Sequence, residues 1–239
     1  MSANDYRTYL KLNARGDDED FDSDMERIED GASRNPYAAW EWGAALRAAG
    51  DFNQAFQARI LASDNFDLIG DKPRSVIAEL DAAIDLAIIA SDSPSDSTNE
   101  DAKKALESAI SKTTKVSSRD VKLLQRVIAK EGEARIALAS ILWDMPGEKA
   151  AAEAQLGESC VRLEQLEVDQ QQRAQSNKLK SSENQNPFDV QSSFSIDDGL
   201  GAGEINCSRF KNEKFLSESL NWPESLQRKT IKLQKLGKK

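Results

Sequence analysis

The chain has 239 residues, of which 39% are hydrophobic and 31% are charged, a composition that suits a globular or helical-repeat protein rather than a membrane or collagen-like one. Its 41 acidic and 32 basic residues give a net charge of −9, which disfavours a nucleic-acid-binding function. Histidine is absent, and this excludes Ser–His–Asp or Cys–His catalysis and every metal site that requires imidazole.

The first 34 residues are predicted to form a flexible, acidic, extended segment. Residues 16–30 contain nine acidic residues and a single basic one, Arg27. Such a stretch has too little apolar surface to fold alone. We therefore expect residues 1–34 to precede the folded domain as a solvated segment.

Residues 35–175 are predicted to form a helical-repeat domain, because small and apolar residues recur there with helical spacing. Asn35-Pro36 starts the first helix, and Gly50-Asp51 separates it from a second that runs to about Asp64. Three further helices are expected at 73–90, 99–112 and about 148–175. Residues 91–98 read as a polar loop. The pattern over 118–145 fits either one helix through Gly132 or two helices.

Two segments follow this domain. Residues 176–208 are rich in Ser, Asn, Gln and Gly and are predicted to be a flexible linker. Residues 209–239 are predicted to be a basic C-terminal arm that contains a helix after Asn221. This arm has a net charge of +6, against −15 for residues 1–208.

One stretch carries a repeat signature. Its bulky, small and turn residues follow the order of one tetratricopeptide repeat: Trp40, Gly43, Leu46, Gly50, Phe52, Ala55 and Ala62. Small residues at such positions let two helices approach where they cross. A weaker copy spans 133–163, and Arg59 departs from the pattern because an apolar residue is usual there. The chain thus resembles tetratricopeptide-repeat proteins, which implies an all-α fold, a short and irregular α-solenoid.

Two sequence stretches also resemble plastid tetratricopeptide-like proteins of algae. They are NPYAAWEWGAALRAAGDFNQAF and NWPESLQRKTIKLQKLGKK. One group of these proteins comprises stromal accessory subunits of photosystem I. The resemblance implies a peripheral protein of the chloroplast stroma whose presequence has been removed, with photosystem I subunits as partners. A cytoplasmic location is the alternative.

The candidate partner-binding residues lie in the basic arm: Trp222, Arg228, Lys229, Lys232 and Lys235. An aromatic side chain beside basic ones is typical of an interface hot spot. Docking of Trp222 back onto the repeats is an equally open alternative.

No catalytic residue, cofactor site or metal site is predicted. Asp20, Asp22 and Asp24 match the first ligands of a calcium loop, but Met25 stands where that loop requires glycine. Cys160 lies on an apolar helix stripe and is expected to be a buried, inert thiol. With Cys207 it makes too small and too widely spaced a set for a disulfide scaffold or a thiolate metal site.

The sequence therefore predicts a non-catalytic protein–protein interaction subunit that scaffolds, assembles or stabilises a larger complex. We expect neither nucleic-acid binding nor a transmembrane segment, although a peripheral position at a membrane is compatible with the charge distribution. The alternatives are an enzyme of unrecognised type and a co-chaperone-like adaptor that reads peptide tails. The adaptor is disfavoured because the first helices of the repeats offer only Arg47 and Arg135 as bases.

Overall fold

The structure is a computed structural model that describes residues 1–15, 23–183 and 206–236, and side chains are described outside 173–183 and Leu236. These residues contain helices and no strand, which confirms the predicted all-α, repeat-like fold. The α-helices are α1 (Ala3–Asn13), α2 (Asp24–Arg34), α3 (Pro36–Ala48), α4 (Phe52–Leu68), α5 (Lys72–Asp92), α6 (Asp96–Thr113), α7 (Val121–Leu142), α8 (Lys149–Glu183) and α9 (Glu224–Leu236).

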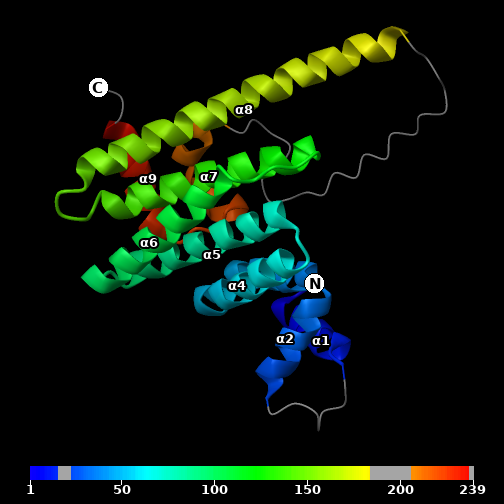
Figure 1. The fold of residues 1–239 in the computed structure, drawn as a ribbon. Helices are drawn as coiled ribbons and strands as arrows, with labels where there is room; N and C mark the ends of the chain where they lie inside the picture. The colour runs from blue at the N-terminus through cyan, green and yellow to red at the C-terminus, as the bar shows by residue number, and fades with distance from the viewer. Residues whose placement is uncertain (16–22, 184–205, 237–239) are drawn as a thin grey trace.

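Successive helices pack as antiparallel hairpins. The pairs α1/α2, α3/α4, α5/α6 and α7/α8 each share an extensive contact within the described residues (Figure 1). Neighbouring hairpins also touch, through α1 with α3, α4 with α5, and α5 with α7. Because each hairpin buries one face against the next, the apolar core runs along the stack.

The N-terminal hairpin corrects the expectation of an extended acidic segment. Ser2 and Ser23 cap α1 and α2 with their side chains, and Leu10 and Ile28 are completely buried. A Cβ on Gly31 would overlap the carbonyl oxygen of Leu10, so the two helices meet backbone to backbone. The high local charge concealed a short apolar face on each helix. Residues 16–22 of the acidic stretch lie outside the described residues.

Local sequence explains the α3/α4 hairpin. Asn35 accepts a hydrogen bond from the Ala38 amide at the start of α3, and Pro36 occupies the first helical turn. Gly50 has a φ of +81°, a conformation that favours glycine, at the turn into α4. Asp51 then caps α4 through the amide of Gln54.

In the middle of the chain, the structure differs from the predicted loop and settles an open helix boundary. The expected eight-residue loop is only 93–95, because α5 continues to Asp92 and Ser95 caps α6. The open question over 118–145 resolves to one helix, α7, which passes through Gly132. A Cβ on Gly132 would lie 2.7 Å from Leu163 Cδ2, so glycine serves the close approach of α8 rather than a break in α7.

Helix α8 is longer than expected and extends past the start of α7 (Figure 1). It continues to Glu183, so the first residues of the predicted linker 176–208 are helical. Residues 184–205 of that linker lie outside the described residues. Its last two residues belong to the short helix η2 (Cys207–Lys211).

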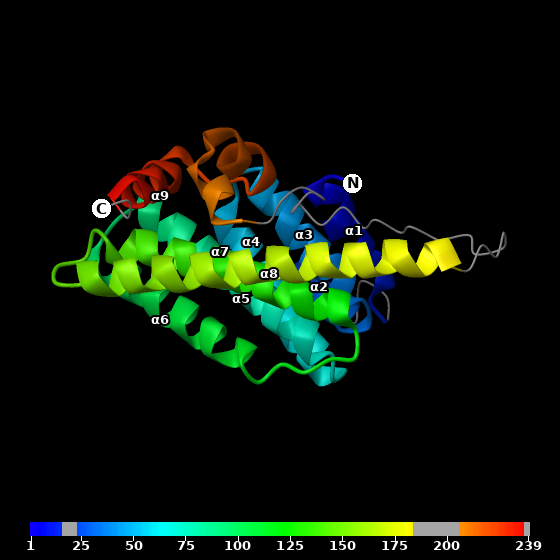
Figure 2. The same ribbon diagram turned by 90° about the horizontal axis from the view of Figure 1, so that it is seen from above.

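The C-terminal segment, residues 206–236, consists of η2, the π-helical turn η3 (Phe215–Ser219) and α9. It is packed, and this corrects the expectation of an extended arm. Helix α9 lies against α5 and α7, on the side of the molecule opposite α6 (Figure 2). The segment therefore covers the face formed by the first helices of two hairpins.

Candidate functional site

The residues of the repeat signature lie where the α3/α4 packing requires them. A Cβ on Gly43 would come within 3.3 Å of the Ala55 carbonyl oxygen, so these two small residues share the helix crossing. Ala55 and Ala62 are completely buried, and Leu46 is buried as well. Trp40 and Phe52 are partly buried against the core.

A buried cluster of charged side chains lies between α3, α4, α5 and α7. The ionic cluster consists of Arg47, Arg59, Lys130, Asp81, Asp85 and Glu133. Asp85 is fully buried and accepts hydrogen bonds from Arg47 Nε at 2.6 Å and Arg59 Nη1 at 2.8 Å. Lys130 Nζ lies 2.9 Å from Asp81 and 2.6 Å from Glu133. Three positive and three negative charges therefore balance inside the stack.

The electrostatics of this cluster follow from burial and close pairing. Burial alone raises the pKa of the Asp81 carboxyl, but its basic neighbours outweigh burial and hold that pKa well below its ordinary value. For Arg47 and Lys130, burial lowers the pKa and the facing carboxylates outweigh it, so both pKa values are raised. All three groups are thus kept in their charged forms.

The ionic cluster acts as a crosslink. Arg47 and Arg59 also donate to the backbone carbonyl of Asp81, and Trp40 Nε1 donates to its carboxylate at 3.0 Å. Removing one member leaves an unpaired charge in the interior, which is strongly destabilising. Sequence reasoning identified Arg59 only as a departure from the repeat pattern. The available signal was the pair Asp81 and Asp85, four residues apart on the largely apolar helix α5.

The predicted partner-binding residues separate into two groups. Trp222 is 2% exposed and packs beside Phe210 in the core, so it is not available to a partner in this structure. Lys229 is largely covered and pairs with Asp144 at 3.0 Å. Trp222 instead docks onto the helical repeats, which was the alternative interpretation.

The remaining predicted residues form an exposed basic face on α9. Arg228, Lys232 and Lys235 are four and three residues apart and therefore share one side of the helix. All three are exposed, and Arg228 makes a solvent-exposed ion pair with Glu224 at 3.5 Å. Because exposed pairs contribute little, this basic face can meet an acidic surface at low cost.

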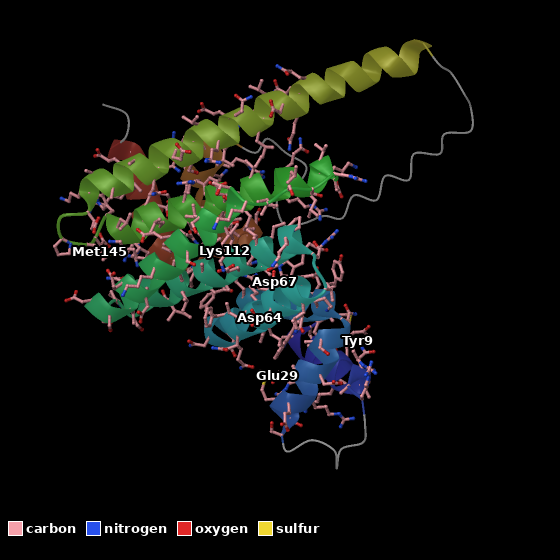
Figure 3. All side chains as sticks on the ribbon, viewed as in Figure 1. Tyr9, Glu29, Asp64, Asp67, Lys112 and Met145 are labelled. Atoms are coloured by element: carbon pink, nitrogen blue, oxygen red, sulfur yellow. A yellow bond between two sulfur atoms is a disulfide. The ribbon has the colours of Figure 1, made fainter. Side chains whose placement is uncertain are left out.

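A groove of about 440 Å³ lies between α4, α5 and the end of α6. Its apolar floor includes Val76 and Val116, and its rim carries charges of both signs. Figure 3 shows three of the rim residues, Asp64, Asp67 and Lys112, at the surface. Lys112 pairs with Glu79 at 2.6 Å, and Asp67 pairs with Lys72. Asp64 and Lys115 add one charge of each sign, so the three acidic and three basic side chains of the lining leave no net charge to select a ligand.

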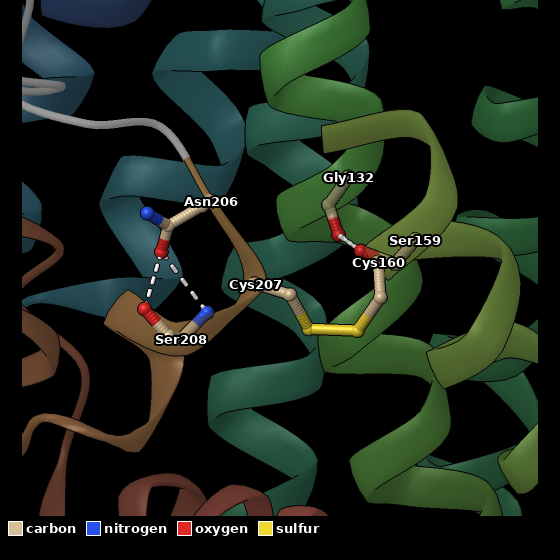
Figure 4. The surroundings of a disulfide bond; sticks show 6 residues. All are labelled: Gly132, Ser159, Cys160, Asn206, Cys207 and Ser208. Carbon is tan, nitrogen blue, oxygen red and sulfur yellow. Dashed lines mark hydrogen bonds between the residues drawn. A yellow bond between two sulfur atoms is a disulfide. The ribbon is translucent and has the colours of Figure 1, made fainter. Parts of the chain in front are cut away.

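Cys160 and Cys207 form a disulfide, with their Cα atoms 4.9 Å apart (Figure 4). This corrects the expectation that Cys160 is an inert free thiol and that two cysteines this far apart in sequence provide no disulfide framework. They are 47 residues apart in sequence, and the packing of the C-terminal segment on α8 brings them together. Neighbouring Ser159 donates to the Gly132 carbonyl at 2.8 Å and fixes this part of α8 against α7.

Within the described ranges 1–15, 23–183 and 206–236, no group of three or more Cys, Asp or Glu side chains is placed to hold a metal ion. Asp20 and Asp22 of the broken calcium pattern lie outside those ranges. Across the same ranges, every helix is too short or too polar to span a bilayer.

Comparison with known proteins finds no match for this chain among protein-family models, curated proteins or solved structures.

Proposed function

We propose that this chain is a non-catalytic subunit that binds other proteins of a larger assembly, with the exposed basic face of α9 as its contact. The observation that carries the proposal is that two of the candidate residues in the C-terminal segment are packed against the helices and three are exposed. Trp222 and Lys229 are used to attach α9 to the helical stack, whereas Arg228, Lys232 and Lys235 point outward. A rigidly anchored helix presents those charges without the entropy loss of ordering a free arm.

The partner class follows from charge. Three bases on one helix face complement an acidic protein surface, and exposed charges of this kind steer association and confer salt sensitivity. In its most concrete form, the proposal is a peripheral accessory subunit at the stromal side of photosystem I. Its support is the resemblance of residues 35–56 and 221–239 to plastid tetratricopeptide-like proteins.

The peptide-tail adaptor receives no support from these contacts. Arg47 is 5% exposed within the ionic cluster, and Arg135 pairs with Glu131 at 2.9 Å. These are the two bases that such an adaptor would offer to a peptide carboxylate. The face of α5 and α7 is, in addition, covered by α9.

The test is co-purification of the tagged full chain from an extract of its native cells. The charge-reversal variant Arg228→Glu/Lys232→Glu/Lys235→Glu should lose its partners, and the wild-type complex should weaken as salt is raised. The matched control is Lys104→Glu/Lys115→Glu/Arg119→Glu, which reverses three exposed charges on α6 and the loop after it. Equal retention of both variants would contradict the proposed contact. Specific co-purification without photosystem I subunits would contradict only its concrete form.

A further inference from the structure

The disulfide lies at the start of the C-terminal segment. Cys160 belongs to α8, and Cys207 is the first residue of η2, where the segment meets the helical stack (Figure 4). Residues 208–236 all follow this point. The bond therefore ties the start of the segment to α8, while α9 packs against α5 and α7.

The segment covers apolar surface on the helices beneath it. Leu216, Leu226 and Leu233 are each at most 1% exposed and belong to the same core as the apolar residues of α5 and α7. Thr230 hydrogen-bonds to Ser140 on α7 at 2.8 Å, with both side chains completely buried. Departure of the segment would uncover this face of α5 and α7.

Docking of the C-terminal segment also buries polar atoms that find no hydrogen-bond partner within the described part of the chain, which is unfavourable. Among the described residues, six buried side-chain polar atoms have no hydrogen-bond partner, and three of them are Trp222 Nε1 and both amide atoms of Gln234. Gln234 is 4% exposed, so its amide loses water on docking and gains no replacement. Half of these unpaired atoms thus lie in one segment, and each of them opposes its docking.

We propose that the Cys160–Cys207 disulfide is a redox-controlled latch that holds the C-terminal segment over α5 and α7. In the oxidised form, Cys207 is kept next to α8, which gives the segment a high effective concentration at its docking face. In the reduced form, only the main chain joins the segment to α8, so the closure entropy that the crosslink had removed opposes docking, by up to about 10³-fold for cysteines 47 residues apart. This latch goes beyond the proposed function and does not depend on it.

The opening reaction is a thiol–disulfide exchange with a dithiol reductant. One thiolate of the reductant attacks the sulfur of Cys160, the less buried residue of the two, and the S–S bond breaks with release of the Cys207 thiolate. The second thiol of the reductant then displaces Cys160 and closes the disulfide of the oxidised reductant. Two electrons pass to the protein, and each released thiolate takes up a proton.

Hydrogen exchange of the full chain, read by mass spectrometry, tests the latch. The air-purified protein should contain the disulfide, and excess dithiothreitol should accelerate exchange at the amides of η3 and α9 by about tenfold or more, with α3 and α4 unchanged. Cys160→Ser and Cys207→Ser should each exchange like the reduced wild type, whether or not dithiothreitol is present. Gln234→Leu, which removes the unpaired amide, should slow exchange of α9 in the reduced state.

Three results would overturn the latch. The first is two free thiols in the protein purified without reductant. The second is identical exchange of α9 in the oxidised and reduced states. The third is acceleration throughout α3 to α9 on reduction, because the disulfide would then stabilise the whole fold rather than hold one segment. Unchanged exchange in Gln234→Leu would overturn the role assigned to the unpaired amide.

Discussion

The side chain of Arg59 on α4 packs directly against Gly43 on α3. A Cβ at residue 43 would lie 2.7 Å from Arg59 Cγ and 3.2 Å from its Nε. Arg59 passes through this gap from α4 to reach Asp85 on α5. Gly43 therefore serves two purposes. It lets α3 and α4 approach each other, and it leaves space for the buried side chain of Arg59.

Substitution at this crossing should be destabilising. We expect Gly43→Leu to lower the free energy of unfolding by about 1–3 kcal/mol, because the new side chain overpacks this space and displaces Arg59. Denaturant unfolding measures the change. Gly157→Ala is the matched control, since a Cβ there meets nothing within 4 Å in α8, and this variant should gain up to about 1 kcal/mol. Equal stability of Gly43→Leu and wild type would contradict the packing.

The ionic cluster should not tolerate the loss of one charge. We expect Asp85→Asn to cost about 3–5 kcal/mol, because Arg47 and Arg59 then share a buried site that lacks their central carboxylate. Thermal and denaturant unfolding provide the measurement. Asp67→Asn, which alters an exposed pair with Lys72, should change stability little. Similar losses in the two variants would argue against a cooperative buried network.

Acid should weaken the fold through Asp81. Its pKa is lowered in the folded state, so its contribution to stability is complete above the ordinary carboxyl pKa near 4 and is lost as the pH falls toward the folded value. The difference in unfolding free energy between wild type and Asp81→Asn should shrink by about 1.4 kcal/mol for each pH unit below 4. Denaturant titrations from pH 6 to pH 2 test this. If the difference in unfolding free energy between the two proteins stayed constant with pH, the predicted loss of stability in acid would be wrong.

Trp222 should act on stability rather than on partner affinity. We expect Trp222→Ala to cost about 3–5 kcal/mol, because a side chain that is 2% exposed leaves a large cavity. Trp222→Phe keeps most of the volume and should cost less. Unfolding midpoints distinguish these outcomes. Normal stability with lost partner binding would restore the hot-spot interpretation.

The N-terminal hairpin provides a backbone test. Gly31→Ala should separate α1 from α2, because the added methyl overlaps the Leu10 carbonyl. We expect faster hydrogen exchange in α1 and no change in α7 or α8. Gly157→Ala again serves as the control, and unchanged protection of α1 would show that the two helices are not in direct backbone contact.

The repeat hairpin could be predicted from sequence because its signals are local. Asn35-Pro36 and Gly50-Asp51 specify helix ends through caps and backbone geometry, and these act within a few residues. The apolar faces of α1 and α2 were missed because charge counts average over a window and hide single buried residues such as Leu10.

The long-range features could not be predicted in this way. The disulfide joins residues 47 apart, and Arg59 meets a carboxylate 26 residues away on another helix. Both depend on how hairpins stack, which local periodicity does not determine. Trp222 was ambiguous for the same reason, because an aromatic residue after a polar stretch suits a partner and an intramolecular core equally well.

The packing of α9 on α5 and α7 has a consequence for biosynthesis. The core is completed by residues of α9, which are synthesised well after α7 ends at Leu142. At about 5–20 residues per second, roughly 5–20 seconds separate the synthesis of α7 from that of α9. During this interval the nascent chain carries an uncovered apolar face. A chain that stalls or is truncated before Leu226 keeps that face exposed, so we expect it to be captured by chaperones or to aggregate.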